Sequence, residues 1–164
     1  MNTVFVMHFL GDTPPELGTQ KPSADDLHVT FLAHVSYEEE PQITELVTRI
    51  GQVAAKTQPF TLTVGELDFF GVNHNIPVKR ISGEIIHAQA LHMNLLVATF
   101  AAGLFSKEPA NHLGDKFSPH VSLPLNHDAI KAGTEIHVNH FSLVEHIGGY
   151  GSSKIRVVKN FSLL

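Results

Sequence analysis

His28-Val-Thr-Phe-Leu-Ala-His-Val35 is the stretch of the chain that decides the fold. Its odd-numbered residues are all apolar, whereas His28, Thr30 and His34 lie at even-numbered positions. Because successive side chains of a strand point to opposite faces, this alternation predicts a strand with one apolar face and one polar face. His28 and Thr30 are then expected to project together from the polar face.

A second stretch, Pro119-His-Val-Ser-Leu-Pro-Leu125, alternates in the same way and places His120 and Ser122 on one face. Apolar residues at helical spacing predict one amphipathic helix in each half, within residues 43–54 and 91–105. Further strands are predicted at residues 1–10, 60–70, 78–86, 134–146 and 154–164. We therefore expect one α+β domain spanning residues 1–164. Its duplicated, two-lobed fold would have two antiparallel sheets with helices on their outer faces and a central cleft.

The composition excludes several classes of function. The chain has no cysteine, which excludes disulfides, thiolate nucleophiles and cysteine-based zinc sites. Its net charge of −5 argues against binding long duplex nucleic acid through the backbone phosphates, which requires clustered lysine and arginine. No apolar run is long enough to cross a membrane, and the first residues lack the features of a signal peptide. We expect a cytoplasmic monomer that has no membrane partner.

Two histidines and two hydroxyl groups suit the cleavage of a phosphodiester. If a pseudo-twofold axis relates the halves, His28 and His120 converge on one phosphorus. One imidazole would remove a proton from the attacking hydroxyl or water, and the other would protonate the leaving oxygen. Thr30 and Ser122 would donate hydrogen bonds to the non-bridging oxygens, where negative charge develops. This chemistry needs no metal or other cofactor, and it leaves open which histidine is the base.

The paired motifs resemble those of the two-histidine (2H) phosphoesterases, which include RNA ligase-like proteins, cyclic nucleotide phosphodiesterases and 2′,5′-oligoadenylate-cleaving enzymes. The family signature is two His-x-Thr/Ser motifs, each followed by a hydrophobic residue. Here these are His28-Val-Thr-Phe31 and His120-Val-Ser-Leu123, 92 positions apart (120 − 28). The resemblance covers nearly the whole chain, including Phe60–Gly71 and Phe161–Leu164.

The resemblance implies two pseudo-symmetric lobes around a cleft and a metal-independent phosphodiesterase. The substrate would be a small nucleotide or short oligonucleotide, namely a 2′,3′-cyclic phosphate, a 2′,5′-linked oligonucleotide or a cyclic oligonucleotide. Many members carry a basic residue just after a motif, whereas here Leu32-Ala-His and Pro124-Leu-Asn follow. This departure argues against a long RNA substrate. The alternatives are a non-catalytic module that binds an RNA end or nucleotide, and a metal-dependent hydrolase.

Other residues are weaker candidates for substrate binding. Tyr150 could stack on a nucleobase, although an exposed tyrosine in a hairpin turn is the slightly preferred interpretation. Lys116 and Phe117, just before the second motif, could contact phosphate and base. A structural role is favoured for His34. A metal site at His137, His140 and His146 is disfavoured, because strand alternation puts His137 and His140 on opposite faces.

Overall fold

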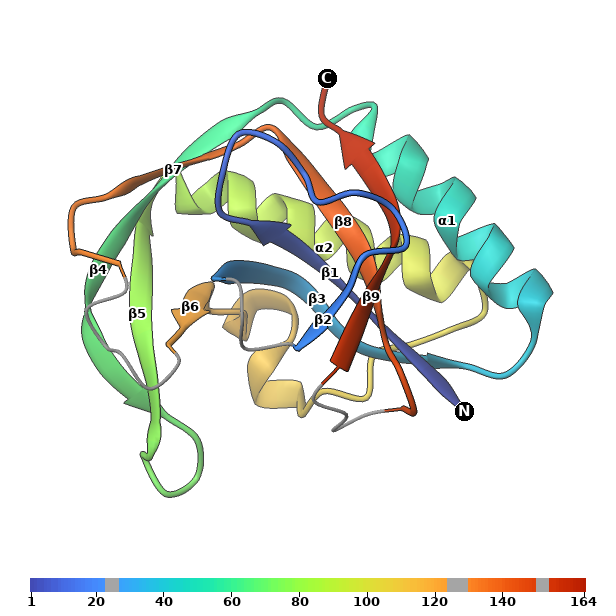
Figure 1. The fold of residues 1–164 in the computed structure, drawn as a ribbon, viewed down its shortest axis with the longest axis horizontal. Coiled ribbons are helices and arrows are strands. Elements are labelled where there is room, and N and C mark those ends of the chain that lie inside the picture. Colours follow the sequence, from blue (N-terminus) through green and yellow to red (C-terminus); the bar gives the residue numbers. More distant parts are fainter. Residues whose placement is uncertain (23–26, 124–129, 150–153) are drawn as a thin grey trace.

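The computed structural model describes residues 1–22, 27–123, 130–149 and 154–164. Its described strands form one curled antiparallel sheet in the order β2-β9-β8-β1-β3-β6-β5-β4-β7 (Figure 1). The strands are β1 (Asn2–Phe9), β2 (Gln20–Pro22), β3 (His28–Tyr37), β4 (Phe60–Phe70), β5 (Ile76–Gly83), β6 (His120–Ser122), β7 (Glu135–Val138), β8 (His140–His146) and β9 (Lys154–Ser162). The two motif strands, β3 and β6, are neighbours near the middle of this sheet.

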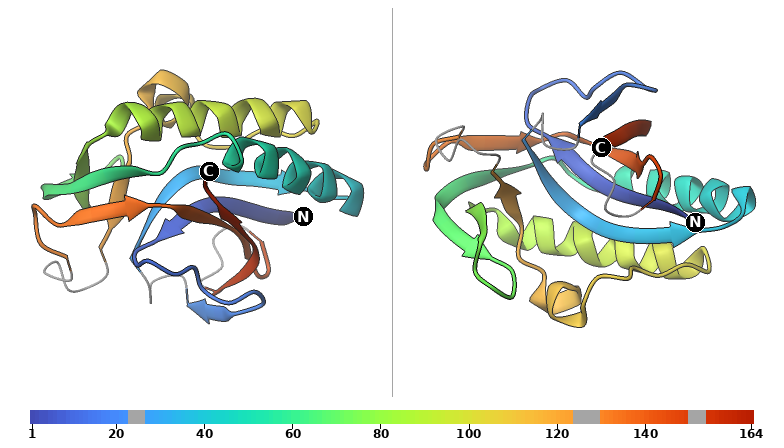
Figure 2. Two further views of the ribbon diagram at one scale, coloured as in Figure 1. Left: turned by 90° about the horizontal axis from the view of Figure 1, so that it is seen from above. Right: turned by 60° about the horizontal axis from the view of Figure 1, so that its bottom comes forward.

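Helices α1 (Glu40–Ala54) and α2 (Ile85–Ala101) pack next to each other on one face of the sheet (Figure 2). At the start of α1 the side chain of Gln42 accepts hydrogen bonds from the backbone N–H groups of Glu38 and Glu39, at 3.0 and 3.1 Å. These bonds satisfy donors that the first helical turn leaves unpaired. Two short 3-10 helices, η1 (Ala110–His112) and η2 (Gly114–Lys116), lie between α2 and β6.

The main core fills the space between the sheet and the helices. It includes Val29 of β3, Val121 of β6 and the apolar faces of both helices. A smaller apolar cluster, with Met7 and Phe9 of β1, involves residues of β1, β8 and β9. Because Val29 and Val121 are fully buried in the main core, the residues on either side of each point to the opposite face. That face carries both motifs.

The prediction of two separate sheets is wrong for the described part of the chain. Val29 pairs with Val121, and this contact joins the strands of the two halves into one sheet. The last two strands also leave their own half, since β8 pairs with β1 of the N-terminal half. Such pairings join residues far apart in the chain, which strand alternation alone does not reveal.

Several boundaries also differ from the prediction. The strand expected at residues 78–86 ends at Gly83, whose φ of 85° interrupts the extended backbone, and α2 begins at Ile85. The segment expected as one strand at residues 134–146 is two strands, β7 and β8, which break at Asn139. Strand β2 was not predicted. No helix in the described residues is long and apolar enough to span a membrane.

Candidate active site

The register between β3 and β6 brings the two motifs together. Val29 lies opposite Val121, so paired positions in this antiparallel ladder add up to 150 (29 + 121). Extended by one step to either side, this antiparallel register puts His28 opposite Ser122 and Thr30 opposite His120. Side chains directly opposite each other have Cβ atoms about 4.5–5.5 Å apart, and diagonal neighbours about 7–8 Å apart. His28 and His120 therefore lie on one diagonal of a four-residue cluster, and Thr30 and Ser122 lie on the other.

An aromatic ring packs against each of the two histidines. The Phe9 ring lies edge-on to His28 with a centroid distance of 5.8 Å, and the Phe70 ring lies edge-on to His120 at 4.8 Å. His28, Thr30 and His120 are half-buried, and Ser122 is exposed. The rings restrict the orientation of both imidazoles while solvent still reaches the cluster.

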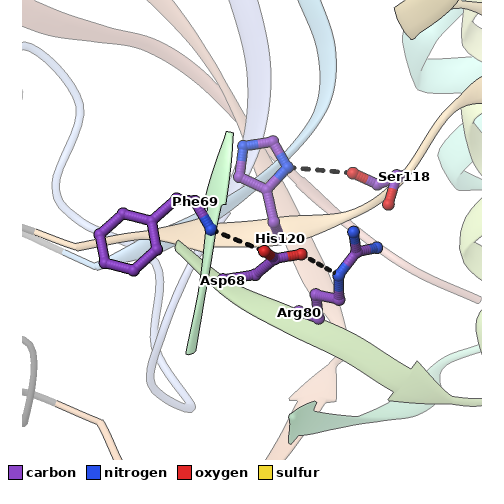
Figure 3. A network of polar contacts seen from close by, with 5 residues as sticks. All are labelled: Asp68, Phe69, Arg80, Ser118 and His120. Carbon is purple, nitrogen blue, oxygen red and sulfur yellow. Dashed lines mark hydrogen bonds and ion pairs between the residues drawn. The ribbon is translucent and has the colours of Figure 1, made fainter. Parts of the chain in front are cut away.

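A hydrogen bond determines which nitrogen of His120 is available. Nδ1 donates to the backbone carbonyl of Ser118 at 3.0 Å (Figure 3). Because a carbonyl oxygen can only accept, Nδ1 carries the hydrogen and Nε2 of the neutral ring keeps a lone pair. Nε2 lies on the side of the ring turned away from Ser118 (Figure 3). The neutral ring can therefore accept a proton at Nε2.

Burial lowers the pKa of His120 below its usual value of 6.5. The hydrogen bond to Ser118 opposes this shift by raising the pKa, and Glu108 acts in the same direction. The positive charges of His112 and Arg80 add to the lowering of the pKa. At neutral pH the His120 imidazole is therefore uncharged, which is the form a general base requires.

Sequence reasoning did not select Arg80, yet Arg80 lies beside the motif cluster. It faces His120 across the β5–β6 ladder. Its Nε donates to the carboxylate of Asp68, which also accepts a hydrogen bond from the backbone of Phe69 (Figure 3). Its guanidinium carbon lies 5.2 Å from the centre of the Phe70 ring. The arrangement holds a permanent cation next to His120, where it can contact a phosphate oxygen.

A cavity of about 200 Å³ opens beside His120. Its lining includes Thr30, Phe70, Phe117 and His120. Phe117, predicted to contact a base, stacks on His92 at a centroid distance of 4.1 Å and an interplanar angle of 7°. Lys116 is exposed and does not line this cavity. Tyr150 lies outside the described residues.

His92 makes hydrogen bonds to two segments that lie beside the motif cluster. Its Nδ1 donates to the backbone carbonyl of Phe31 at 2.7 Å, and its Nε2 accepts from the backbone N–H of Gly114 at 3.0 Å. Both bonds require a neutral ring, in agreement with burial lowering the pKa of His92. Since both nitrogens are engaged, His92 links the first motif strand to the loop before the second motif. His92 belongs to no sequence motif, so the sequence did not predict it as a site residue.

His34 does not line the cavity beside His120. It adopts a φ of 55° within β3, and the charges near it are those of Glu108, Lys107 and His146. His137 shares a hydrogen bond with Thr61 at 3.0 Å. Among the described residues, no group of three or more histidine, aspartate or glutamate side chains is arranged to hold a metal ion.

Comparison with solved structures identifies the fold. A crystal structure described as a phosphoesterase superposes with a TM-score of 0.70 at 18% identity, covering 99% of this chain and 98% of that chain. Escherichia coli LigT complexed with NADP+ gives 0.69 at 18% identity, covering 99% and 97%. The chain has the fold of the two-histidine phosphoesterases.

A third similar structure, TT0787 of Thermus thermophilus, gives a TM-score of 0.65 at 20% identity over 98% of this chain and 97% of that one. No family model matches the sequence, and no curated protein matches it. The likeness is therefore one of three-dimensional structure over nearly the full chain, as the paired motifs led us to expect.

Proposed function

We propose that the chain is a phosphodiesterase that cleaves a small nucleotide-derived phosphodiester by acid–base catalysis at His28 and His120. The observation that carries this proposal is the β3–β6 register, in which the two motifs form one four-residue cluster. The two imidazoles lie diagonally across this cluster. One can therefore serve the attacking oxygen and the other the leaving oxygen, on opposite sides of a phosphorus atom. A module that only bound phosphate would not require this pairing.

In the proposed reaction His120 is the base and His28 is the acid. The neutral His120 removes a proton from the attacking water or hydroxyl through Nε2, as that oxygen bonds to phosphorus. The phosphorus–oxygen bond to the leaving group breaks, and a protonated His28 gives its proton to the departing oxygen. The assignment of His120 as base rests on its lowered pKa and on the hydrogen bond between Nδ1 and Ser118.

Three groups are proposed to stabilise the charge that develops on the phosphate. The hydroxyl groups of Thr30 and Ser122 donate to non-bridging oxygens, each beside one histidine. Arg80 adds a cation whose side chain is already oriented by Asp68. Side chains therefore supply both the proton transfers and the charge stabilisation, and we expect cleavage without an added metal ion.

Two observations support a small substrate. The cavity beside His120, lined by Thr30 but not by His28 or Ser122, is about 200 Å³, smaller than the about 300–1,000 Å³ of common ligand pockets, so it suits the part of a nucleotide on the His120 side of the phosphate. Crystal structures of the similarly folded LigT contain 3′-AMP, NADP+ or ATP. We propose the same class of ligand for this chain: a 2′,3′-cyclic phosphate, a 2′,5′-linked oligonucleotide or a cyclic oligonucleotide.

The test is a panel of these three substrate types and a 3′,5′-linked oligonucleotide, with the phosphate position of each product determined. We expect cleavage that persists in EDTA and is lost in both His28→Ala and His120→Ala. His137→Ala, which changes an exposed histidine outside the cluster, is the matched control. Activity that disappears in EDTA and returns with zinc or manganese would support the metal-dependent hydrolase instead. Binding without turnover across the panel would identify a nucleotide-binding module.

A further inference from the structure

Helix α2 presents an apolar face to solvent. Its 17 residues include no aspartate, glutamate, lysine or arginine. The inward side carries the buried Leu91, His92 and Leu95. The outward side carries exposed apolar residues, which are Ile86, Ala90, Met93, Val97 and Phe100. Surface helices normally have a charged or polar outer face, so an uncharged apolar one indicates a surface that another molecule covers.

The outward residues follow a regular spacing of four, three, four and three positions. This is the spacing of the apolar seam that packs helices into a coiled coil. The exposed fractions are 74% for Ile86, 65% for Val97 and 77% for Phe100. The 3-10 helices η1 and η2 lie next to α2 on the side away from the sheet (Figure 2), with Gly114 beside Met93, whereas Val97 and Phe100 remain largely exposed. We call these five residues the α2 seam.

We propose that the α2 seam is the interface of a two-fold symmetric dimer, with α2 packed antiparallel against α2 of a second copy. Met93 is the middle residue of the seam, so the two-fold axis passes beside it. Ile86 then faces the second copy's Phe100, and Ala90 faces the second copy's Val97. This dimer departs from the monomer expected from the sequence, and it does not depend on the proposed activity.

The charges around α2 favour a second copy in the antiparallel orientation. Arg49 and Lys56 of α1 line the groove beside Val97 and Ala101, near the C-terminal half of α2. Glu84 precedes the N-terminus of α2, and its side chain is 52% exposed. Antiparallel packing brings Glu84 of one copy towards Lys56 of the other and also opposes the two helix dipoles. A parallel arrangement would place Glu84 of one copy near Glu84 of the other, and Lys56 near Lys56.

The seam supplies the centre of an interface. Ile85, 42% exposed, adjoins the seam at the N-terminus of α2. At roughly 100 Å² for each large apolar side chain, the surface offers roughly 500 Å² per copy. A standard interface buries about 800 Å² on each partner, so the rim residues of α1 would complete it. A membrane surface is a poorer occupant, because helices that lie on membranes carry lysine and arginine along their polar face.

Sedimentation of the full chain across low to high micromolar concentration tests the proposal. We expect a reversible monomer–dimer equilibrium in which Phe100→Glu weakens the dimer by roughly 100-fold or more, because two unpaired carboxylates would be buried. The matched control is Val72→Glu, since Val72 is 98% exposed in the β4–β5 turn and lies outside the seam. Lys56→Glu is expected to weaken the dimer by roughly tenfold.

A disulfide trap tests the position of the axis. The chain has no native cysteine, so Met93→Cys introduces a single thiol that faces its own copy across the axis. We expect Met93→Cys to form a covalent dimer on mild oxidation much faster than Val72→Cys. A chain that is monomeric at every concentration, or a dimer insensitive to Phe100→Glu, would overturn the proposal. Seam-dependent binding to phosphatidylcholine vesicles without self-association would also overturn it.

Discussion

Arg80 on β5 lies opposite His120 on β6, and its positive charge contributes to the lowered pKa of that histidine. The two residues are 40 positions apart in the chain (120 − 80), and only the pairing of β5 with β6 makes them neighbours. The carboxylate of Asp68 and the ring of Phe70 hold the guanidinium in place. Arg80 therefore has two expected effects, on phosphate binding and on the protonation of the base.

Replacing Arg80 by glutamine should reveal both effects. A lost hydrogen bond to a charged group costs about 1.5–3 kcal/mol, so we expect kcat/KM to fall by roughly 10- to 100-fold. Removal of the cation should also raise the pKa of His120 and shift the acidic limb of the rate profile to higher pH. Arg49→Gln, an exposed arginine paired with Glu45 on α1, is the control. An unchanged pH profile in Arg80→Gln would contradict the electrostatic part of this prediction.

The rate of cleavage should depend on pH as a bell-shaped curve. The base must be neutral and the acid protonated in the same turnover, so the two limbs report apparent pKa values of the pair. Because burial lowers the pKa of His120, the acidic limb is expected below pH 6.5. Steady-state kinetics from acid to alkaline pH measure this. A rate that rises steadily with pH would indicate that no protonated acid is needed.

Single replacement of His28 or His120 by alanine should lower the rate by roughly 10²–10⁴, which is the usual contribution of a positioned acid or base. The double replacement should cost much less than the product of the two, since the residues act as a unit. His34→Ala should leave the rate near that of the unmodified chain. If His34→Ala were as damaging as His28→Ala while both variants stayed folded, the catalytic pair would be wrongly assigned.

Removal of the hydroxyl groups should have smaller effects than removal of the histidines. We expect Thr30→Ala and Ser122→Ala each to cost at most about 2–4 kcal/mol of transition-state stabilisation, by comparison with the loss of one oxyanion donor. Thr30→Ser and Ser122→Thr keep the hydroxyl group and are the controls. Equal losses in the alanine variants and the hydroxyl-retaining variants would point to packing, not to hydrogen bonding, as the cause.

The sequence predicts the features of the site that depend on neighbouring residues in the chain better than those that depend on contacts between distant residues. Alternation along β3 and β6 is local, and it correctly predicts strands with Val29 and Val121 buried. That the two motifs meet was inferred from their duplication, and the register of β3 with β6 agrees with it. Arg80 was missed because its neighbour His120 belongs to another strand. No local pattern states which strands pair or in which register.

The fold was predicted less well where local signals conflict. Ile85 and Ile86 continue the apolar pattern of β5, which predicts a single strand through residue 86. The left-handed backbone of Gly83 ends the strand before these residues. His34 was expected to share the face of Thr30. Its φ of 55° and the register shift between β1 and β3 interrupt the alternation there. Such irregularities depend on tertiary contacts, including the hydrogen bond from Lys107 to the His34 carbonyl.

The buried pair His8 and His140 should make stability depend on pH. His8 is fully buried, and its Nδ1 lies 2.8 Å from the backbone carbonyl of His140. The two rings have centroids 4.6 Å apart, and within the described residues neither Nε2 has a hydrogen-bond partner. Burial lowers the pKa of His8 from 6.5 to about 4; the hydrogen bond to the His140 backbone opposes this lowering, and the charge of the His140 ring adds to it. The folded state therefore resists protonation at this position.

The sign of the pH effect follows from this lowered pKa. Between pH 6.5 and about 4 the unfolded chain binds a proton at His8 that the folded chain does not, so the free energy of unfolding falls as the pH falls. Above pH 6.5 the effect is absent, and across the window it amounts to about 3 kcal/mol. Urea titrations at several pH values should show this loss in the unmodified chain and in His87→Gln, an exposed control. His8→Leu should show a flatter dependence, because it removes the group that titrates. A slope in His8→Leu equal to that of the unmodified chain would assign the acid sensitivity to other residues.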